Sequence, residues 1–255
     1  MVKDVRRVYS FSNENLTAYQ HLYNFNDARV LSVGGSGDQY FTAILNGAKE
    51  VELYDKEAAM WPYFITKFYG IQNLSYEEFF ELFVSIGADF ETIEQKMQPY
   101  LPEKALETLS FWRKRAIIEL GYRDSECRKR IIETHSIPYL EKESYEKLQE
   151  SLRERKLPEF YGENLFFLPR RVGQTYYDIM LTSNIRDYVV IWPDPDKEYL
   201  KLLDKFNCPT IQAHYCFKYR RGLDSEFKQR CIETPVTGWF HDEGEIDYVY
   251  TYQKK

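Results

Sequence analysis

Three glycines within four positions are the residues of this chain best suited to hold a ligand. Gly34, Gly35 and Gly37 follow an apolar run rich in β-branched residues, 30–33, and precede a helix-compatible stretch, 38–46. This pattern predicts a strand, a tight turn and the start of a helix. Glycine has no Cβ to keep a ligand off the backbone, and the first N–H groups of a helix are free to bind acceptors. The turn therefore predicts a site for a phosphate, a ribose or a carboxylate.

An acidic residue stands at a matching distance from this turn. The alternating stretch 50–55 predicts a second strand that ends in Asp55, twenty positions after Gly35. A carboxylate at the end of that strand can accept both hydroxyls of a ribose lying beside the turn. A glycine turn alone often has a steric explanation, but the turn and the acid together favour ligand binding. They predict an adenosine-like nucleoside.

The residues missing from the turn narrow the kind of nucleoside ligand. A dinucleotide fingerprint that begins at Gly35 would need a glycine where Tyr40 stands, and no Gly-Lys-Ser/Thr of a P-loop follows the turn. What remains is a site for a single nucleoside with a shortened fingerprint. S-adenosylmethionine fits such a site, because it has no phosphates and needs neither the lysine nor a pyrophosphate cradle.

Composition limits the possible partners, metal sites and cellular locations. The net charge of -6 gives no global basic field, so a nucleic-acid partner is not expected. The four cysteines form no C-x-x-C pair and the four histidines are far apart, which indicates neither a metal site nor a disulfide framework and favours a reducing, cytoplasmic location. No signal segment or apolar run of ~20 residues predicts a membrane span, although peripheral membrane contact stays open.

The chain divides into an arm, a ligand-binding domain and an insertion. Ser75 and Glu78 form a capping box that starts a helix, and helical, charge-rich sequence continues from there to Pro158. We interpret this stretch as a cap that shapes an acceptor pocket, although an aromatic stripe at such spacing is more often core. The arm either closes over the ligand or is a packing extension, and we favour the extension. The expected divisions are an N-terminal arm at 1–28, an S-adenosylmethionine-binding Rossmann-like domain at 29–74 and 159–255, and a helical insertion at 75–158.

Later strands are expected at 164–168, 177–182, 209–217 and, as an edge strand, 246–252. Ser183 and Asn184 follow the second of these. Polar residues at the carboxyl end of a parallel strand point into the crevice where ligands bind, but Ser183 is equally suited to be a helix N-cap. Both interpretations stay open.

Charged clusters in the second half of the chain are either anion-binding sites or ordinary solvated surface. The basic stretches 218–221 and 169–171 have the composition that receives an anionic headgroup or an RNA phosphate. In an acidic protein such stretches are more often solvated surface paired with acids, and we favour that interpretation. The acid-rich stretch 241–245 predicts a hairpin turn.

Four stretches together carry a resemblance to a known family. Residues 31–38, Asp55, residues 74–83 and residues 181–185 resemble the bacterial S-adenosylmethionine-dependent 3-amino-3-carboxypropyl transferases that make betaine-lipid headgroups. Most methyltransferases have an acid where this chain has Ser32, whereas that family is similar to this chain in having serine there. The family tends to have asparagine two positions after the strand-end acid, where this chain has glutamate.

The resemblance implies a Rossmann-like α/β fold with a methyltransferase-type sheet, helices on both faces and a large helical insertion between the second and third strands. It implies a small-molecule or lipid-headgroup acceptor, in-line displacement at a carbon next to a sulfonium, and His214 or Tyr215 as general base with Asn184 orienting. A lone histidine on an apolar strand is more often structural. The alternative is a non-catalytic nucleoside-binding module, and the oligomeric state stays open. The implied cofactor-binding residues are Ser32, Gly34, Gly35, Ser36, Gly37, Asp38, Asp55, Lys56, Ser183 and Asn184.

Overall fold

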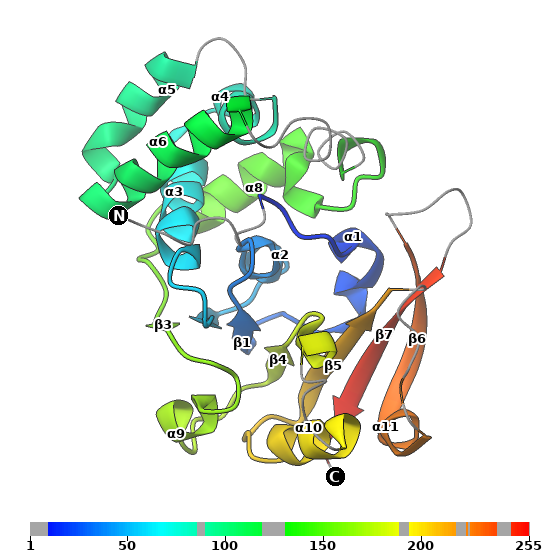
Figure 1. Cartoon of the computed structure of the whole chain (residues 1–255). Helices are drawn as coiled ribbons and strands as arrows, with labels where there is room; N and C mark the ends of the chain where they lie inside the picture. Colours follow the sequence, from blue (N-terminus) through cyan, green and yellow to red (C-terminus); the bar gives the residue numbers. More distant parts are fainter. Residues whose placement is uncertain are drawn as a thin grey trace.

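A mixed sheet with helices on both faces forms the centre of the molecule (Figure 1). The computed structural model describes residues 10–85, 90–118, 131–188, 194–217, 223, 225–238 and 246–254. The α/β class predicted from the sequence is confirmed. The seven strands are β1 (Arg29–Val33), β2 (Glu50–Tyr54), β3 (Phe160–Tyr161), β4 (Ile179–Leu181), β5 (Thr210–Cys216), β6 (Cys231–Thr237) and β7 (Ile246–Gln253).

The strands are ordered β3-β2-β1-β4-β5-β7-β6 across the sheet. Strands β1 to β5 pair in parallel, and β7 runs antiparallel to both of its neighbours, β5 and β6. The chain builds β2 and β3 on one side of β1 and then crosses to β4 on the other side. Such a reversal of strand order opens a crevice at the carboxyl ends of the strands, where ligands bind in open α/β sheets.

Two strand predictions are wrong. Residues 164–168 form turns and the start of a helix, while β3 lies earlier, at Phe160–Tyr161. The Asn164 side chain accepts from the Phe166 N–H, an Asx turn that competes with extended backbone. The stretch 246–252 is not an edge, because β7 pairs on both sides and β6 is the outer strand. Pro235 fits that outer position, where a ladder N–H is not needed.

One face of the sheet is covered by the arm and by helices from the first two thirds of the chain. Phe41, Phe64 and Phe68 pack there over Val30 and Leu53 in the larger hydrophobic core. The predicted glycine end of α2 is confirmed, since Gly47 follows its last residues with φ +91°. The elements on this face include α1 (Leu16–Tyr19), the 3-10 helix η2 (Gln20–Leu22), α2 (Asp38–Leu45), α3 (Met60–Asn73) and α8 (Lys142–Leu152).

The opposite face carries a smaller core under three short helices. Leu31, Met180 and Ile211 face it from β1, β4 and β5. The helix predicted from Asp194 is confirmed, because the Asp194 side chain accepts from the Lys197 N–H at its start. The helices on this face are α9 (Leu168–Val172), α10 (Pro195–Leu203) and α11 (Ser225–Arg230).

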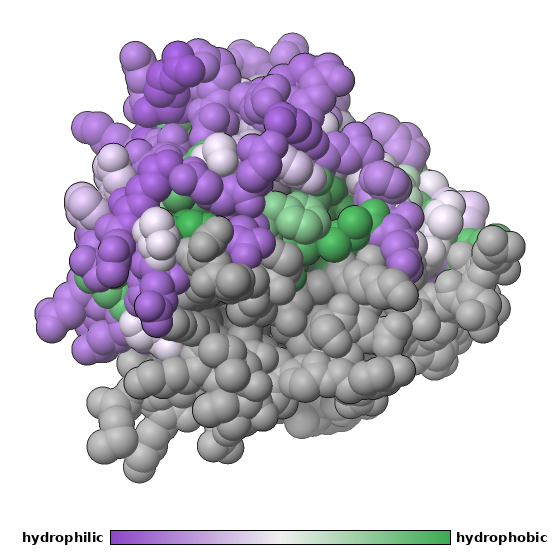
Figure 2. All heavy atoms as spheres, turned by 90° about the horizontal axis from the view of Figure 1, so that it is seen from above, coloured by the Kyte–Doolittle hydropathy of each residue, from purple (hydrophilic) through white to green (hydrophobic). Residues whose placement is uncertain are grey.

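Between β2 and β3, the residues that the structure describes form helices joined by turns and loops, and no strand. Besides α3 and α8 these are α4 (Tyr76–Phe80), the π-helix η3 (Glu81–Ser85), α5 (Phe90–Met97), the 3-10 helix η4 (Gln98–Tyr100), α6 (Glu103–Ile118) and the 3-10 helix η5 (Pro138–Leu140). Seen from above, the described residues on this side are mostly polar, and a smaller apolar area lies next to them (Figure 2). That these helices cap an acceptor pocket stays a prediction.

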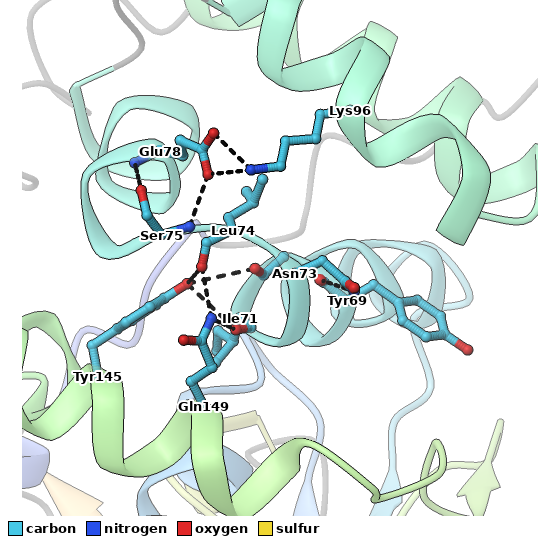
Figure 3. A network of polar contacts seen from close by, with 10 residues as sticks. Tyr69, Ile71, Asn73, Leu74, Ser75, Glu78, Lys96, Tyr145 and Gln149 are labelled. Atoms are coloured by element: carbon cyan, nitrogen blue, oxygen red, sulfur yellow. Dashed lines mark hydrogen bonds and ion pairs between the residues drawn. The ribbon is translucent and has the colours of Figure 1, made fainter.

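The predicted capping box forms at the start of α4. Ser75 accepts from the Glu78 N–H, and Glu78 accepts in return from the Ser75 N–H (Figure 3). Two side chains of α8, Tyr145 and Gln149, donate to the Leu74 carbonyl at the end of α3. These bonds satisfy backbone groups that the helix ends leave free, and they join α8 to α3.

Candidate functional site

The glycine turn and Asp55 meet at the carboxyl ends of β1 and β2. The parallel register pairs Val33 with Tyr54, so the residues that follow the two strands are neighbours. The Gly35 N–H donates to Asp55 Oδ2 over 2.8 Å, and the Glu57 N–H donates to Asp55 Oδ1 over 2.8 Å. The spacing in the sequence thus corresponds to a direct contact between the acid and the turn.

Glycine stands at each of the three positions of the turn for a different structural reason. A Cβ on Gly34 would stand 2.0 Å from the Met60 methyl carbon, and one on Gly37 would stand 2.9 Å from the Phe64 ring. Gly35 and Gly37 have positive φ angles, +51° and +83°. A Cβ on Gly35 would meet no atom within 4 Å. Packing and a positive φ thus explain Gly37, the flexible end of Met60 fills the space beside Gly34, and the backbone at Gly35 borders open space.

Asp55 keeps acceptor capacity for a ligand. Its side chain is half-buried, and burial raises its pKa while the two backbone N–H bonds lower it. Each carboxylate oxygen accepts one of these bonds and has lone-pair capacity left for a hydroxyl. Lys56 next to it is exposed and lies 6.0 Å from the Tyr188 ring and 3.9 Å from the Glu57 carboxylate. The structure therefore joins Asp55 to the turn but leaves Lys56 on the surface.

Asp38 is buried under the arm. Its carboxylate accepts from Lys67 Nζ over 2.5 Å, from Ser36 Oγ over 2.7 Å, from the Ser12 N–H and from the Tyr139 hydroxyl. Lys67 is completely buried, so burial lowers its pKa and Asp38 raises it. In this structure Asp38 and Ser36 use their hydrogen bonds to join the arm, α3 and η5 to the turn.

A second carboxylate under the arm, Glu14, was not predicted. It is completely buried and accepts from Ser183 Oγ, from the Tyr19 hydroxyl over 2.6 Å and from Gln39 Nε2 over 3.2 Å. Gln39 in turn accepts from Ser32 Oγ over 3.2 Å. Ser32 and Ser183, both predicted site residues, are thus linked through Glu14. No pattern in the arm distinguishes Glu14 from a surface acid, because its partners lie far along the chain.

Ser183 and Asn184 lie between β4 and the 3-10 helix η6 (Ile185–Tyr188). Ser183 has φ +57°, which is uncommon for a residue with a side chain. Its hydroxyl donates to Glu14, and Asn184 Oδ1 lies 3.4 Å from the same hydroxyl. The Ser183 hydroxyl is therefore a hydrogen-bond donor to the buried Glu14 carboxylate.

The two candidate bases, His214 and Tyr215, are consecutive residues of β5, so their side chains point to opposite faces of the sheet. The register of β5 against β7 shifts between Gln212 and His214. Tyr215 belongs to the core beneath the arm, and its hydroxyl donates to Asp247 over 2.8 Å and accepts from the Asn15 N–H over 3.3 Å.

His214 is placed differently. It is completely buried, its Nε2 lies 3.5 Å from Asp187 Oδ1, and its ring stacks on Tyr250, a residue of the opposite core. His214 and Tyr215 are therefore not brought together at one site. Tyr215 has a pKa well above its usual range because of burial, and it positions the arm.

Several predicted surface features are only partly described. The stretches 218–221 and 241–245 lie outside the described residues. In the third stretch, Arg171 of α9 lies 3.8 Å from the Glu163 carboxylate, a surface ion pair of the kind we favoured for that stretch.

Searches for metal sites, membrane spans and relatives give no positive result. Within the described ranges, no group of three or more His, Cys, Asp and Glu side chains is arranged to hold a metal ion. In the same part of the chain, no helix has the length and apolar character to cross a bilayer. Comparison with protein-family models and with curated protein sequences gives no match. We therefore infer the function from the residues and their geometry.

Proposed function

We propose that the protein is an S-adenosylmethionine-dependent transferase that moves a 3-amino-3-carboxypropyl or methyl group to a small-molecule or lipid-headgroup acceptor. The observation that carries the proposal is the contact between Asp55 and the Gly35 N–H at the reversal of strand order. It puts a carboxylate with spare acceptor capacity beside the open backbone of Gly35, as a ribose requires. A cytoplasmic location is part of the same proposal.

The sheet supports this choice of ligand. The order β3-β2-β1-β4-β5-β7-β6, with β7 alone reversed, is consistent with the methyltransferase-type Rossmann-like sheet that the resemblance implies. A dinucleotide-binding sheet of the common order instead has six parallel strands. Because one fold hosts many functions, the sheet supports the proposal and the residues at its edge carry it.

The proposed ligand would lie across the carboxyl end of β1. Its ribose hydroxyls would bind Asp55 after β2, and its amino-acid end would reach Ser183 and Asn184 after β4, on the other side of β1. The ligand supplies an electrophilic carbon next to a sulfonium leaving group. The chain's part is to hold an acceptor in line with that carbon, an effect worth up to ~7–11 kcal/mol in favourable cases.

Calorimetry with S-adenosylhomocysteine tests the proposal. We expect the wild-type chain to bind it and Asp55→Ala to weaken binding about tenfold to a hundredfold, because hydrogen bonds to charged groups contribute about 1.5–3 kcal/mol. Glu57→Gln is the matched control, since it removes a neighbouring charge and keeps the N–H that Asp55 accepts. Absence of binding, or equal affinity in Asp55→Ala, would contradict the proposal.

The two transfer reactions leave different products. Methyl transfer leaves S-adenosylhomocysteine, whereas 3-amino-3-carboxypropyl transfer leaves methylthioadenosine, and mass spectrometry of the spent cofactor distinguishes them. The second candidate function is a non-catalytic nucleoside-binding module. It is favoured by Ser32 at the end of β1 and by the structural bonds of Tyr215. Turnover of the cofactor with any acceptor would exclude it.

A further inference from the structure

The arm buries two carboxylates, and only one of them has a cation. Asp38 accepts from Lys67 Nζ over 2.5 Å, with both side chains completely buried. Glu14 is equally buried, but its donors are neutral side chains, among them Ser183, Tyr19 and Gln39. Within the part of the chain that the structure describes, Glu14 forms no ion pair.

An unpaired buried carboxylate is energetically unfavourable. Removing a charged group from water costs free energy unless a partner of opposite charge compensates it. Accordingly, burial raises the pKa of Glu14, and the hydrogen bonds from Ser183, Tyr19, Gln39 and Gln212 oppose that rise. All of these donors are neutral, so no cation compensates the charge of the Glu14 carboxylate. A cationic ligand would relieve the cost.

The location of Glu14 indicates which part of the ligand would carry the cation. Ser183 holds the carboxylate at the end of β4, and Gln39 joins it to Ser32 at the end of β1. Asp55 lies at the end of β2, on the other side of β1. A donor whose ribose binds Asp55 would bring its amino-acid end toward Glu14.

The backbone around Ser183 is also held in an unusual state. Its φ of +57° is retained while the Ser183 N–H donates to Gln212 Oε1 over 3.0 Å and its hydroxyl donates to Glu14. Backbone strain of this kind persists where the surrounding structure fixes it, often at ligand sites. In this conformation the Ser183 hydroxyl lies against the Glu14 carboxylate.

We propose that Glu14 binds the ammonium group of the donor's amino-acid moiety. The N-terminal arm would thereby supply the carboxylate that most methyltransferases have at the end of the first strand, where this chain has Ser32. Gln39 bridges the two positions, because it accepts from Ser32 and donates to Glu14. This inference rests on the proposed function, and it gives the arm a role in recognition of the ligand as well as in packing.

Calorimetry with two ligands tests the inference on the full chain. S-adenosylhomocysteine has the ammonium group, and methylthioadenosine has the same nucleoside without the amino-acid end. We expect Glu14→Gln to weaken binding of S-adenosylhomocysteine at least tenfold, because a charge-assisted bond is lost, and to change binding of methylthioadenosine less than twofold. Glu77→Gln, which removes an exposed charge on α4, is the control for net charge and should leave both affinities unchanged.

The outcomes separate this inference from the proposed function. If the wild-type chain binds neither ligand, the proposed function fails and the inference falls with it. If the wild-type chain binds both and Glu14→Gln weakens neither, or both equally, only the inference is overturned. Should Glu14→Gln fail to fold, wild-type binding of deaminated S-adenosylhomocysteine decides: we expect at least tenfold weaker binding than for S-adenosylhomocysteine, and equal affinity would overturn the inference.

Discussion

At the scale of single residues, three carboxylates near the turn have three different situations. Asp55 is half-buried and bonded to backbone N–H groups, Asp38 is paired with Lys67, and Glu14 is buried among neutral donors. The sequence identified Asp55 because its spacing from the turn follows from two adjacent parallel strands. It did not identify Glu14, whose partner Ser183 lies 169 positions away.

The burial of Glu14 predicts a pH dependence of stability. Its pKa in the folded chain is raised above the ordinary value of 4.5, so the unfolded chain loses its proton first. The stabilisation from Glu14 is therefore fully present below pH ~4 and is lost as pH rises through the folded pKa. Glu14→Gln stays neutral, so its free energy of unfolding should rise relative to wild type as pH increases from 4 to 7. Urea unfolding at these pH values measures both free energies of unfolding. A difference between variant and wild type that does not change with pH would contradict the prediction.

At the scale of elements, the arm is held by contacts from the far end of the chain. Asn15 caps α1 and donates from its side chain to the Thr237 carbonyl of β6, while its N–H donates to Tyr215 of β5. The arm thus covers the turn and bonds to β5 and β6, the two strands that flank the reversed strand β7. Its composition alone allowed a closing arm or a packing extension, because neither the contact with Tyr215 nor that with Thr237 leaves a local pattern.

The phenol of Tyr215 should contribute to stability through the arm. In Tyr215→Phe, the buried Asn15 N–H loses its acceptor and Asp247 loses a donor. We expect the free energy of unfolding to fall by about 1–3 kcal/mol, as for other buried polar groups left without a partner. Denaturant unfolding measures the change. Tyr176→Phe on the exposed surface is the control and should have no effect, and an equal effect in both variants would contradict the role of Tyr215.

At the scale of the whole molecule, features set by neighbouring residues could be predicted from the sequence, whereas the pairing of distant strands could not. The glycine turn, the capping box at Ser75 and the helix start at Asp194 depend on neighbouring residues and form as expected. Strand β3 has only two residues, and its place is set by pairing with β2. The internal position of β7 is set by β6, a strand with Pro235 at its centre. Such pairings depend on tertiary context, which strand propensity does not contain.

The same topology joins the separate parts of the site. The strand order puts Asp55 at the end of β2, the open turn at the end of β1 and Ser183 at the end of β4, three adjacent positions along one edge. The arm closes this edge with Glu14. The proposed ligand, a nucleoside with an amino-acid tail, has two polar ends that would match the two carboxylates.

The most direct test is a backbone-amide NMR titration of the full chain with S-adenosylhomocysteine. The account predicts saturable shifts that are largest at Gly35 and Glu57, whose N–H groups donate to Asp55, and at Ser183, which bonds Glu14. It also predicts that Asp55→Ala requires a higher ligand concentration for the same shifts. The absence of shifts, or shifts confined to residues away from the carboxyl ends of β1, β2 and β4, would contradict it.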